Sequence, residues 1–132
     1  MTDQELEQAI KTVMVFDGWE LRNDDPEEYS NGYYKHESKS MTLSTRPSII
    51  RQYTYYRNSW NWIHPVWEKF RDMKKDNLYA SSLGSFKKMT IDIMHREYCN
   101  KIRPHITDGT KMEAFTTLYE AITWFNSLNR EQ

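Results

Sequence analysis

The residues best suited to chemistry lie in one short run, His95-Arg-Glu97-Tyr-Cys99. Histidine, carboxylate and thiolate are all ligands that zinc accepts. On an extended strand every second side chain projects from one face, so His95, Glu97 and Cys99 would form a row. The run also contains the H-x-E part of a zinc deaminase signature, but the sequence lacks the P-C-x-x-C part that supplies the other ligands. These three residues are metal candidates, although for the chain as a whole we expect no metal and no cofactor.

Cys99 is also considered as a nucleophile, which requires a base within hydrogen-bonding distance. His95 lies four residues away, and on an extended strand that separation is about 13 Å, which is too far. His36 and His105 could approach only through folding. The sequence contains no C-x-x-C, H-E-x-x-H or G-x-S-x-G motif and no glycine-rich phosphate loop. Catalysis is therefore the third of our hypotheses, and we expect no catalytic residues.

A second group of residues combines aromatic rings with arginines within segment 46–62. Its members are Arg51, Tyr53, Tyr55, Arg57, Trp60 and Trp62. Aromatic rings stack on nucleic acid bases and arginines bind phosphates, so the group is our candidate binding site. The wider segment 46–103 holds twelve bases against five acids, a net charge of 12 − 5 = +7. The alternative interpretation is a strand–helix corner in which half of the aromatic rings belong to the core.

Composition narrows the classes of protein that fit. The chain has 132 residues, which suits a single domain over residues 1–132. Its 18 basic and 19 acidic residues give a net charge of −1, so bulk charge provides no case for nucleic acid. The single cysteine excludes an intramolecular disulfide. The longest apolar stretches are far shorter than the roughly 20 residues of a membrane span, so we expect a cytoplasmic protein without a membrane partner.

The patterns at the two ends of the chain predict helices. Thr2-Asp-Gln-Glu5 matches a capping box, and apolar residues from Leu6 to Met14 follow at helical spacing. Gly18 lies where a helix would end in the left-handed conformation. Thr110-Lys-Met-Glu113 is a second capping box, and an apolar stripe continues from it to Leu128.

A central helix is predicted between them. Apolar residues recur every three to four positions from Trp60 to Met73. Asn58 or Ser59 would cap this helix. Pro65 falls inside the pattern, so either the regular helix begins near His64 or its first turn is kinked.

Strands are predicted in the remaining segments. Trp19–Arg22 and Tyr33–His36 are predicted as short strands on either side of an acidic connection rich in turn signals. Ile49–Tyr56 has the β-branched and aromatic content of a strand. Residues 89–94 alternate apolar with other side chains and predict a strand that continues toward Ile102. The predicted fold class is therefore α+β: a small antiparallel sheet with an N-terminal, a central and a C-terminal helix packed on one face.

Two longer stretches carry a resemblance. Tyr56-Arg-Asn-Ser-Trp-Asn-Trp-Ile-His-Pro-Val-Trp-Glu-Lys69 resembles a Y-x-x-S-W-x-W-[LI]-x-P-V-x-x-K pattern. Residues 111–126 resemble a K-[IM]-E-A-x-x-x-x-x-x-A-[IV]-x-[WF]-[YF]-N ending. The pair resembles small uncharacterised proteins of bacteriophages and prophages, notably of the Bacteroidetes type. No activity is known for that group, so the resemblance implies no site residues.

These observations lead to ranked hypotheses. The first is a non-enzymatic phage or prophage accessory protein that binds another protein, because the chain is rich in the aromatic residues typical of interfaces. The second is a nucleic-acid-binding module that uses the basic and aromatic segment 46–62. Self-association through exposed Trp or Tyr residues is a further hypothesis.

Overall fold

The computed structural model describes residues 2–22, 33–36, 42–44, 55–73 and 85–130, and the statements below refer to these residues. The helices are α1 (Asp3–Asp17), α3 (Tyr55–Asn58), α4 (Trp60–Arg71), α5 (Ser85–Thr107) and α6 (Lys111–Arg130). The strands are β1 (Glu20–Arg22), β2 (Tyr33–Lys35) and β3 (Thr42–Ser44). Of these helices, none is long and apolar enough to cross a membrane.

Helix α1 begins and ends as its sequence predicts. The Thr2 side chain accepts a hydrogen bond from the Glu5 amide at 3.1 Å, and the Glu5 carboxylate accepts one from the Thr2 amide at 3.1 Å. Gly18 ends the helix with a φ of 110° and donates to the carbonyls of Met14 and Val15. A residue with a Cβ atom adopts this left-handed conformation only at a cost, which explains the glycine. The capping box and the glycine together fix both ends of α1.

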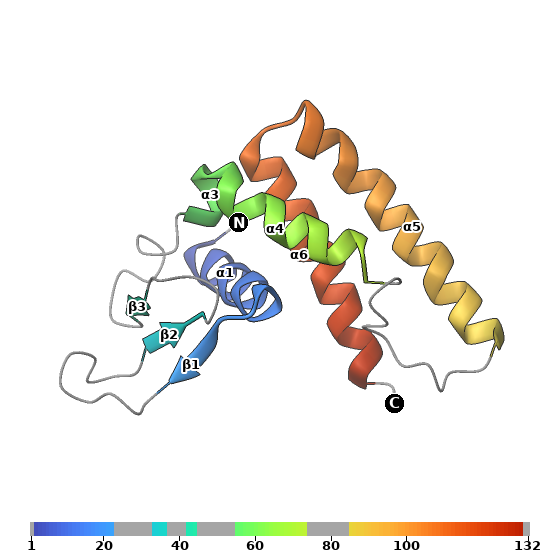
Figure 1. Ribbon diagram of the computed structural model, residues 1–132, viewed down its shortest axis with the longest axis horizontal. Coiled ribbons are helices and arrows are strands. Elements are labelled where there is room, and N and C mark those ends of the chain that lie inside the picture. Colours follow the sequence, from blue (N-terminus) through green and yellow to red (C-terminus); the bar gives the residue numbers. More distant parts are fainter. Residues whose placement is uncertain (1, 23–32, 37–41, 45–54, 74–84, 131–132) are drawn as a thin grey trace.

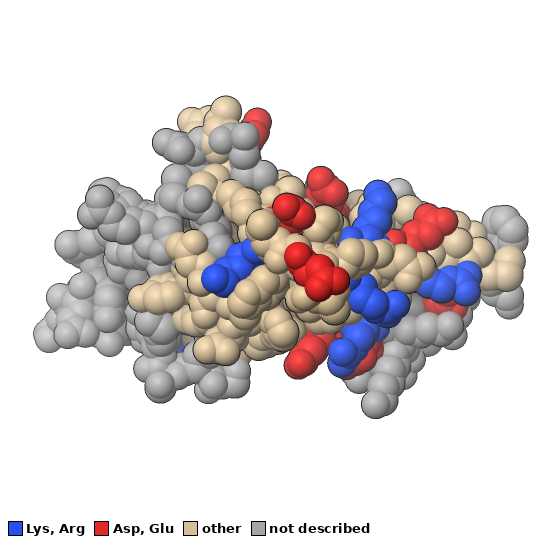
Figure 2. Space-filling view, turned by 90° about the horizontal axis from the view of Figure 1, so that it is seen from above, with Lys and Arg blue, Asp and Glu red and all other residues tan. Residues whose placement is uncertain are grey.

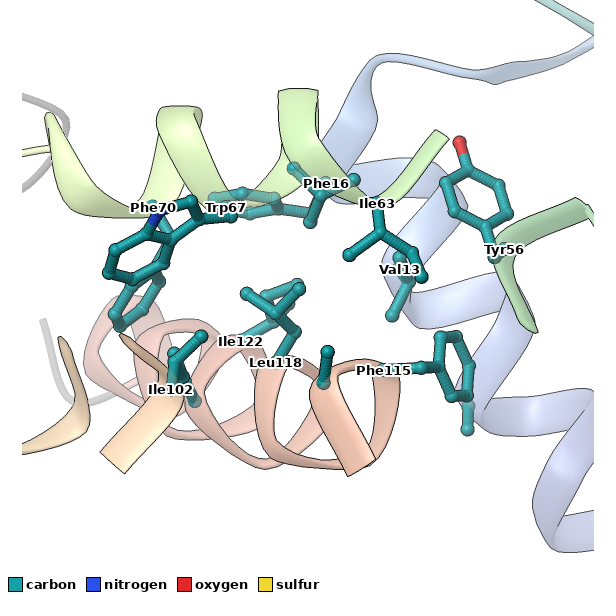
Figure 3. Packing of buried hydrophobic residues seen from close by; sticks show 14 of the residues in the cluster. Val13, Phe16, Tyr56, Ile63, Trp67, Phe70, Ile102, Phe115, Leu118 and Ile122 are labelled. Atoms are coloured by element: carbon teal, nitrogen blue, oxygen red, sulfur yellow. The ribbon is translucent and has the colours of Figure 1, made fainter. Parts of the chain in front are cut away.

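The helices pack on one another around α6, which contacts α1, α3, α4 and α5. Figure 1 shows α6 running beneath α4, with α1 on one side and α5 on the other. Side chains of α4 and α6 point toward each other in the core, among them Ile63 and Leu118 (Figure 3). Both residues are almost completely buried. The hydrophobic surface that stabilises the fold is therefore shared mainly between helices.

The α+β prediction is wrong, and the described core indicates an all-α architecture. Strands β1, β2 and β3 have only three residues each and form an antiparallel meander in the order β1-β2-β3. They lie beside α1 at one end of the molecule, away from α5 (Figure 1). The buried hydrophobic residues belong to the helices and to the residues directly after them, such as Trp19 and Met73. The helices thus cover each other and not one face of a sheet.

The strand predicted at residues 89–94 is also wrong, because these residues lie within helix α5. Ile91, His95, Cys99 and Ile102 are buried at helical spacing, and they face the other helices. Met89 and Ile93 are exposed on the opposite side. A pattern of six residues is too short to separate the two-residue period of a strand from the 3.6-residue period of a helix. The buried positions from Ile91 to Ile102 follow the helical period.

The remaining corrections concern the start of α4 and the segment before it. Helix α4 begins at Trp60 and runs through Pro65, so of the two predicted alternatives the start near His64 is wrong. Ser59 precedes it in an extended conformation without a side-chain capping hydrogen bond. The predicted strand at residues 49–56 is wrong at its end, because Tyr55 lies in α3 together with residue 56. Residues 49–54 lie outside the described part of the chain.

Candidate protein-binding site

The predicted binding residues fall into two sets. Arg51 and Tyr53 lie outside the described residues, and Arg57 is described only by its backbone in α3. Tyr55, Trp60 and Trp62 are described with their side chains. The site is therefore built from these three and from the residues that surround them.

The indole of Trp62 belongs to a packed cluster of rings. It stacks on Trp19 with ring centroids 5.6 Å apart, and on Tyr55 at 4.9 Å. The ring of Tyr56 meets it edge-on at 5.0 Å. Trp62 is thus engaged by three aromatic neighbours and contributes packing energy to the fold. Tyr55, which is 40% exposed, is the member of this cluster nearest to solvent.

Two rings of this cluster also belong to a hydrogen-bond network, which we call the Tyr56 network. It comprises Asp17, Trp19, His36 and Tyr56. The Trp19 indole donates to the Tyr56 hydroxyl at 2.8 Å, and that hydroxyl donates to the Asp17 carboxylate. His36 Nε2 donates to the Asp17 backbone carbonyl at 2.6 Å. Burial, reinforced by the charge of Asp17, raises the pKa of Tyr56 well above its ordinary value. The phenol therefore stays protonated and serves as a structural donor.

The metal candidates do not form the predicted row, because α5 is a helix and not a strand. His95 and Cys99 are four residues apart on the buried face, with Sγ 3.6 Å from Nε2. Glu97 is exposed on a different side of the helix. The predicted distance of about 13 Å between His95 and Cys99 is wrong for the same reason. Among the described residues no group of three possible ligands gathers to hold a metal.

The contact between His95 and Cys99 does not form a catalytic pair. His95 Nε2 lies 2.7 Å from the backbone carbonyl of Phe70, which can only accept a hydrogen bond. This nitrogen therefore carries the proton, and it cannot take one from the thiol. Burial raises the pKa of the Cys99 thiol, while Arg103 and Arg71 oppose the change. The thiol is thus protonated and poorly nucleophilic, and His95 ties α5 to the end of α4.

Trp60 points away from this cluster, toward the turn between α5 and α6. There it lines an open hollow of about 560 Å³, which we call the Trp60 hollow. Its lining consists of Trp60, His64, Ile106, Thr107, Asp108 and Gly109. The rings of Trp60 and His64 meet edge-on with centroids 5.4 Å apart. The three described aromatics of the predicted group are therefore divided between two sides of α4, and of these three Trp60 is the one that lines the Trp60 hollow.

The turn that forms one wall of the Trp60 hollow is held tightly. Gly109 donates to the His105 carbonyl at 3.2 Å, and a Cβ atom on Gly109 would lie only 2.6 Å from the Cα atom of His105. Thr110 caps α6 by accepting from the Glu113 amide at 3.1 Å, and Glu113 in turn contacts His105 Nδ1 at 2.9 Å. Asp108 was not predicted as a site residue, because an aspartate before Gly109 indicates a turn and no more.

The described part of segment 46–103 carries nearly balanced charge. Segment 46–103 has twelve basic residues, and the structure describes the side chains of 12 − 7 = 5 of them. It also describes four acidic side chains in this segment, so the described charges nearly balance. Basic and acidic side chains are interspersed over the face shown in Figure 2. A phosphate backbone would thus meet no continuous positive surface on the described part of this face.

Comparison with known proteins adds no family to this geometry. No protein-family model, no curated protein and no solved structure matches the chain. The resemblance to phage and prophage proteins consequently stays a prediction, and the function is argued from the Trp60 hollow itself.

Proposed function

We propose that the protein is a non-enzymatic accessory protein of the phage or prophage type that acts in the cytoplasm by binding another protein. The observation that carries the proposal is the Trp60 hollow, in which an indole, an imidazole and the partly buried Ile106 border an open cavity. Tryptophan is the residue type that most often dominates the binding energy of an interface. A partner side chain that enters a hollow next to such a residue is shielded from water, as the central residues of an interface are.

The engagement of the chemically capable side chains supports a non-enzymatic role. Tyr56 and His36 donate hydrogen bonds to Asp17. His95 donates to the Phe70 carbonyl. In each case a carboxylate or a backbone carbonyl holds the group, and the contact joins two elements of the fold. Such contacts stabilise the native structure and leave the groups badly placed for proton transfer to a substrate.

The alternative, a nucleic-acid-binding module in segment 46–62, is less well supported by the described residues. Trp62 already packs against three rings, and the acidic Asp108 lines the Trp60 hollow. A carboxylate at a binding site opposes phosphate. Protein binding is therefore the better proposal.

A capture experiment with matched variants tests the proposal. The wild-type chain and the variants Trp60→Ala and Met89→Ala would be immobilised and exposed to a lysate of the host cells. Met89 is 54% exposed and lies near the opposite end of α5. We expect a captured protein that is retained by wild type and by Met89→Ala but lost with Trp60→Ala. Equal capture by all three forms would contradict the proposal.

Two control measurements address the competing partners. Titration with short DNA and RNA, followed by tryptophan fluorescence at low and moderate salt, tests for nucleic acid. Strong salt-dependent quenching would favour the alternative function. Sedimentation of the purified chain tests for self-association, and a dimer that dissociates in Trp60→Ala would identify a second copy as the protein partner.

A further inference from the structure

The Trp60 hollow also carries an inference about the chemistry of its occupant, which rests on the proposed function. We propose that the hollow receives a cationic side chain of the partner protein, and specifically an arginine. Three electron-rich features occur in its lining: Trp60, Asp108 and the C-terminal end of helix α5.

The carboxylate and the helix end make the hollow electronegative. Asp108 is exposed, and the structure shows no ion pair between it and another described residue. Ile106 and Thr107 are the last two residues of α5 and both line the hollow. The C-terminal end of a helix carries a partial negative charge and attracts cations. Both features therefore act in the same direction on a ligand.

The indole adds an attraction of its own. A cation placed over the face of a tryptophan ring is attracted by the negative face of the π-system. Trp60 is partly exposed and lines the hollow, and its contact with the neighbouring His64 ring is edge-to-face. A single contact of this kind covers at most one face of the indole.

The basic groups near the hollow include two histidines: His64 is the basic residue of its lining, and His105 in the last turn of α5 contacts the Glu113 carboxylate. Lys111 follows the turn but does not line the hollow. The N-terminus of α6 carries a partial positive charge, which Thr110 caps and Glu113 in the first turn offsets. The lining itself contains Asp108 as its acid and no lysine or arginine.

Arginine fits this arrangement better than lysine. Its planar guanidinium stacks on an aromatic ring and at the same time donates two parallel hydrogen bonds to a carboxylate. Trp60 and Asp108 line the same cavity, and their side chains are of the two types that these contacts require. A phosphate or an acidic peptide would instead be repelled by Asp108.

The test uses acetyl-arginine amide as the probe and its neutral isostere acetyl-citrulline amide as the comparison. Both are titrated into the full, isotopically labelled chain, and the NMR signals of the Gly109 amide and the Trp60 indole N–H are followed. We expect saturable shifts with arginine, at a dissociation constant on the order of millimolar, and none with citrulline. Equal shifts with the two compounds, or arginine shifts confined to other residues, would overturn the inference.

Variants locate the interaction. Asp108→Asn should weaken arginine binding roughly two- to fivefold, the range of an exposed ion pair. Trp60→Leu should weaken it by a similar factor, roughly two- to fivefold. Glu120→Gln removes an exposed acid from α6 and serves as the charge-matched control, which should bind as wild type does. Arginine binding that is the same in Asp108→Asn as in wild type would overturn the inference, even if Trp60→Leu proved poorly folded.

The two proposals fail separately. Capture of a protein that depends on Trp60, combined with no response to arginine, overturns this inference and leaves the proposed function standing. Capture that does not depend on Trp60 overturns the proposed function and this inference with it. A response to an oligonucleotide at Gly109 and Trp60, in place of arginine, also overturns it.

Discussion

The Tyr56 network and the Trp60 hollow contain the same types of residue on two sides of α4. Each has an aspartate, a histidine and a tryptophan. In the network the tryptophan is 2% exposed, and its polar atom donates to a neighbouring side chain. In the hollow the aspartate and the histidine are exposed and the tryptophan is partly exposed. Residue type therefore does not distinguish a structural cluster from a binding surface, whereas burial and hydrogen-bond partners do.

The largest expected effect separates the two tryptophans. Trp19→Ala removes a fully buried ring together with its hydrogen bond to Tyr56, so the free energy of unfolding should fall by about 3–5 kcal/mol. Trp60→Ala should cost about 1 kcal/mol, because its ring is only partly buried. Urea denaturation measures both. Equal losses would mean that the two sides of α4 do not differ in the way described.

The next effect concerns the hydroxyl at the centre of the network. Tyr56→Phe keeps the buried ring but removes the hydroxyl that accepts from the Trp19 indole and donates to the Asp17 carboxylate. The expected loss is about 1–3 kcal/mol, the range for hydrogen bonds lost by buried polar groups. Tyr119→Phe on the partly exposed side of α6 is the control, with an expected change within about 0.5 kcal/mol. A loss with Tyr56→Phe no greater than that of the control would show that the network contributes no stability.

Gly18 tests how the network is joined to α1. Alanine there must adopt a φ of 110°, and its Cβ atom would lie 3.0 Å from His36 Nε2. We expect a loss of about 1–2 kcal/mol from the left-handed conformation. The same measurement on Gly18→Asn should show a smaller loss of backbone origin, because asparagine tolerates this region better. A neutral Gly18→Ala would indicate that the helix end relaxes without cost.

The smallest effect is a pH dependence from the buried thiol. Because burial raises the pKa of Cys99 in the folded state, the unfolded chain loses this proton first as the pH rises. Stability should therefore decrease above the ordinary pKa of 9.0 and continue to decrease until the folded thiol also ionises. Cys99→Ala should remove this part of the decrease, as denaturation at a series of pH values would show. An identical pH profile in wild type and variant would contradict the assignment.

The sequence predicted those features that depend on local chemistry. The capping boxes at Thr2 and Thr110 and the left-handed Gly18 involve residues within a turn of one another, so the sequence alone contains their cause. The strand assigned to residues 89–94 was wrong because a six-residue pattern contained no information about which side would be covered. That information comes from α4 and α6, which contact α5 and lie outside the six-residue window.

The same dependence on distant contacts governs the candidate site. Trp60 and Trp62 are two residues apart, and the predicted binding group joined them by composition without regard to the faces of a helix. A helix turns about 100° per residue, so positions two apart point in nearly opposite directions. The partnership of Trp60 with Asp108 spans 48 positions (108 − 60) and follows only from the way α4 meets the α5–α6 turn.

Helix α6 has a consequence for the order in which the fold is made. It contacts α1, α3, α4 and α5, and it follows all four along the chain. During synthesis, the apolar faces of the earlier helices thus emerge from the ribosome before the element that covers them exists. Until residues 111–130 have left the ribosome, those apolar faces can bind chaperones or other nascent chains. We therefore expect the yield of native protein to depend on chaperones that bind these faces during synthesis.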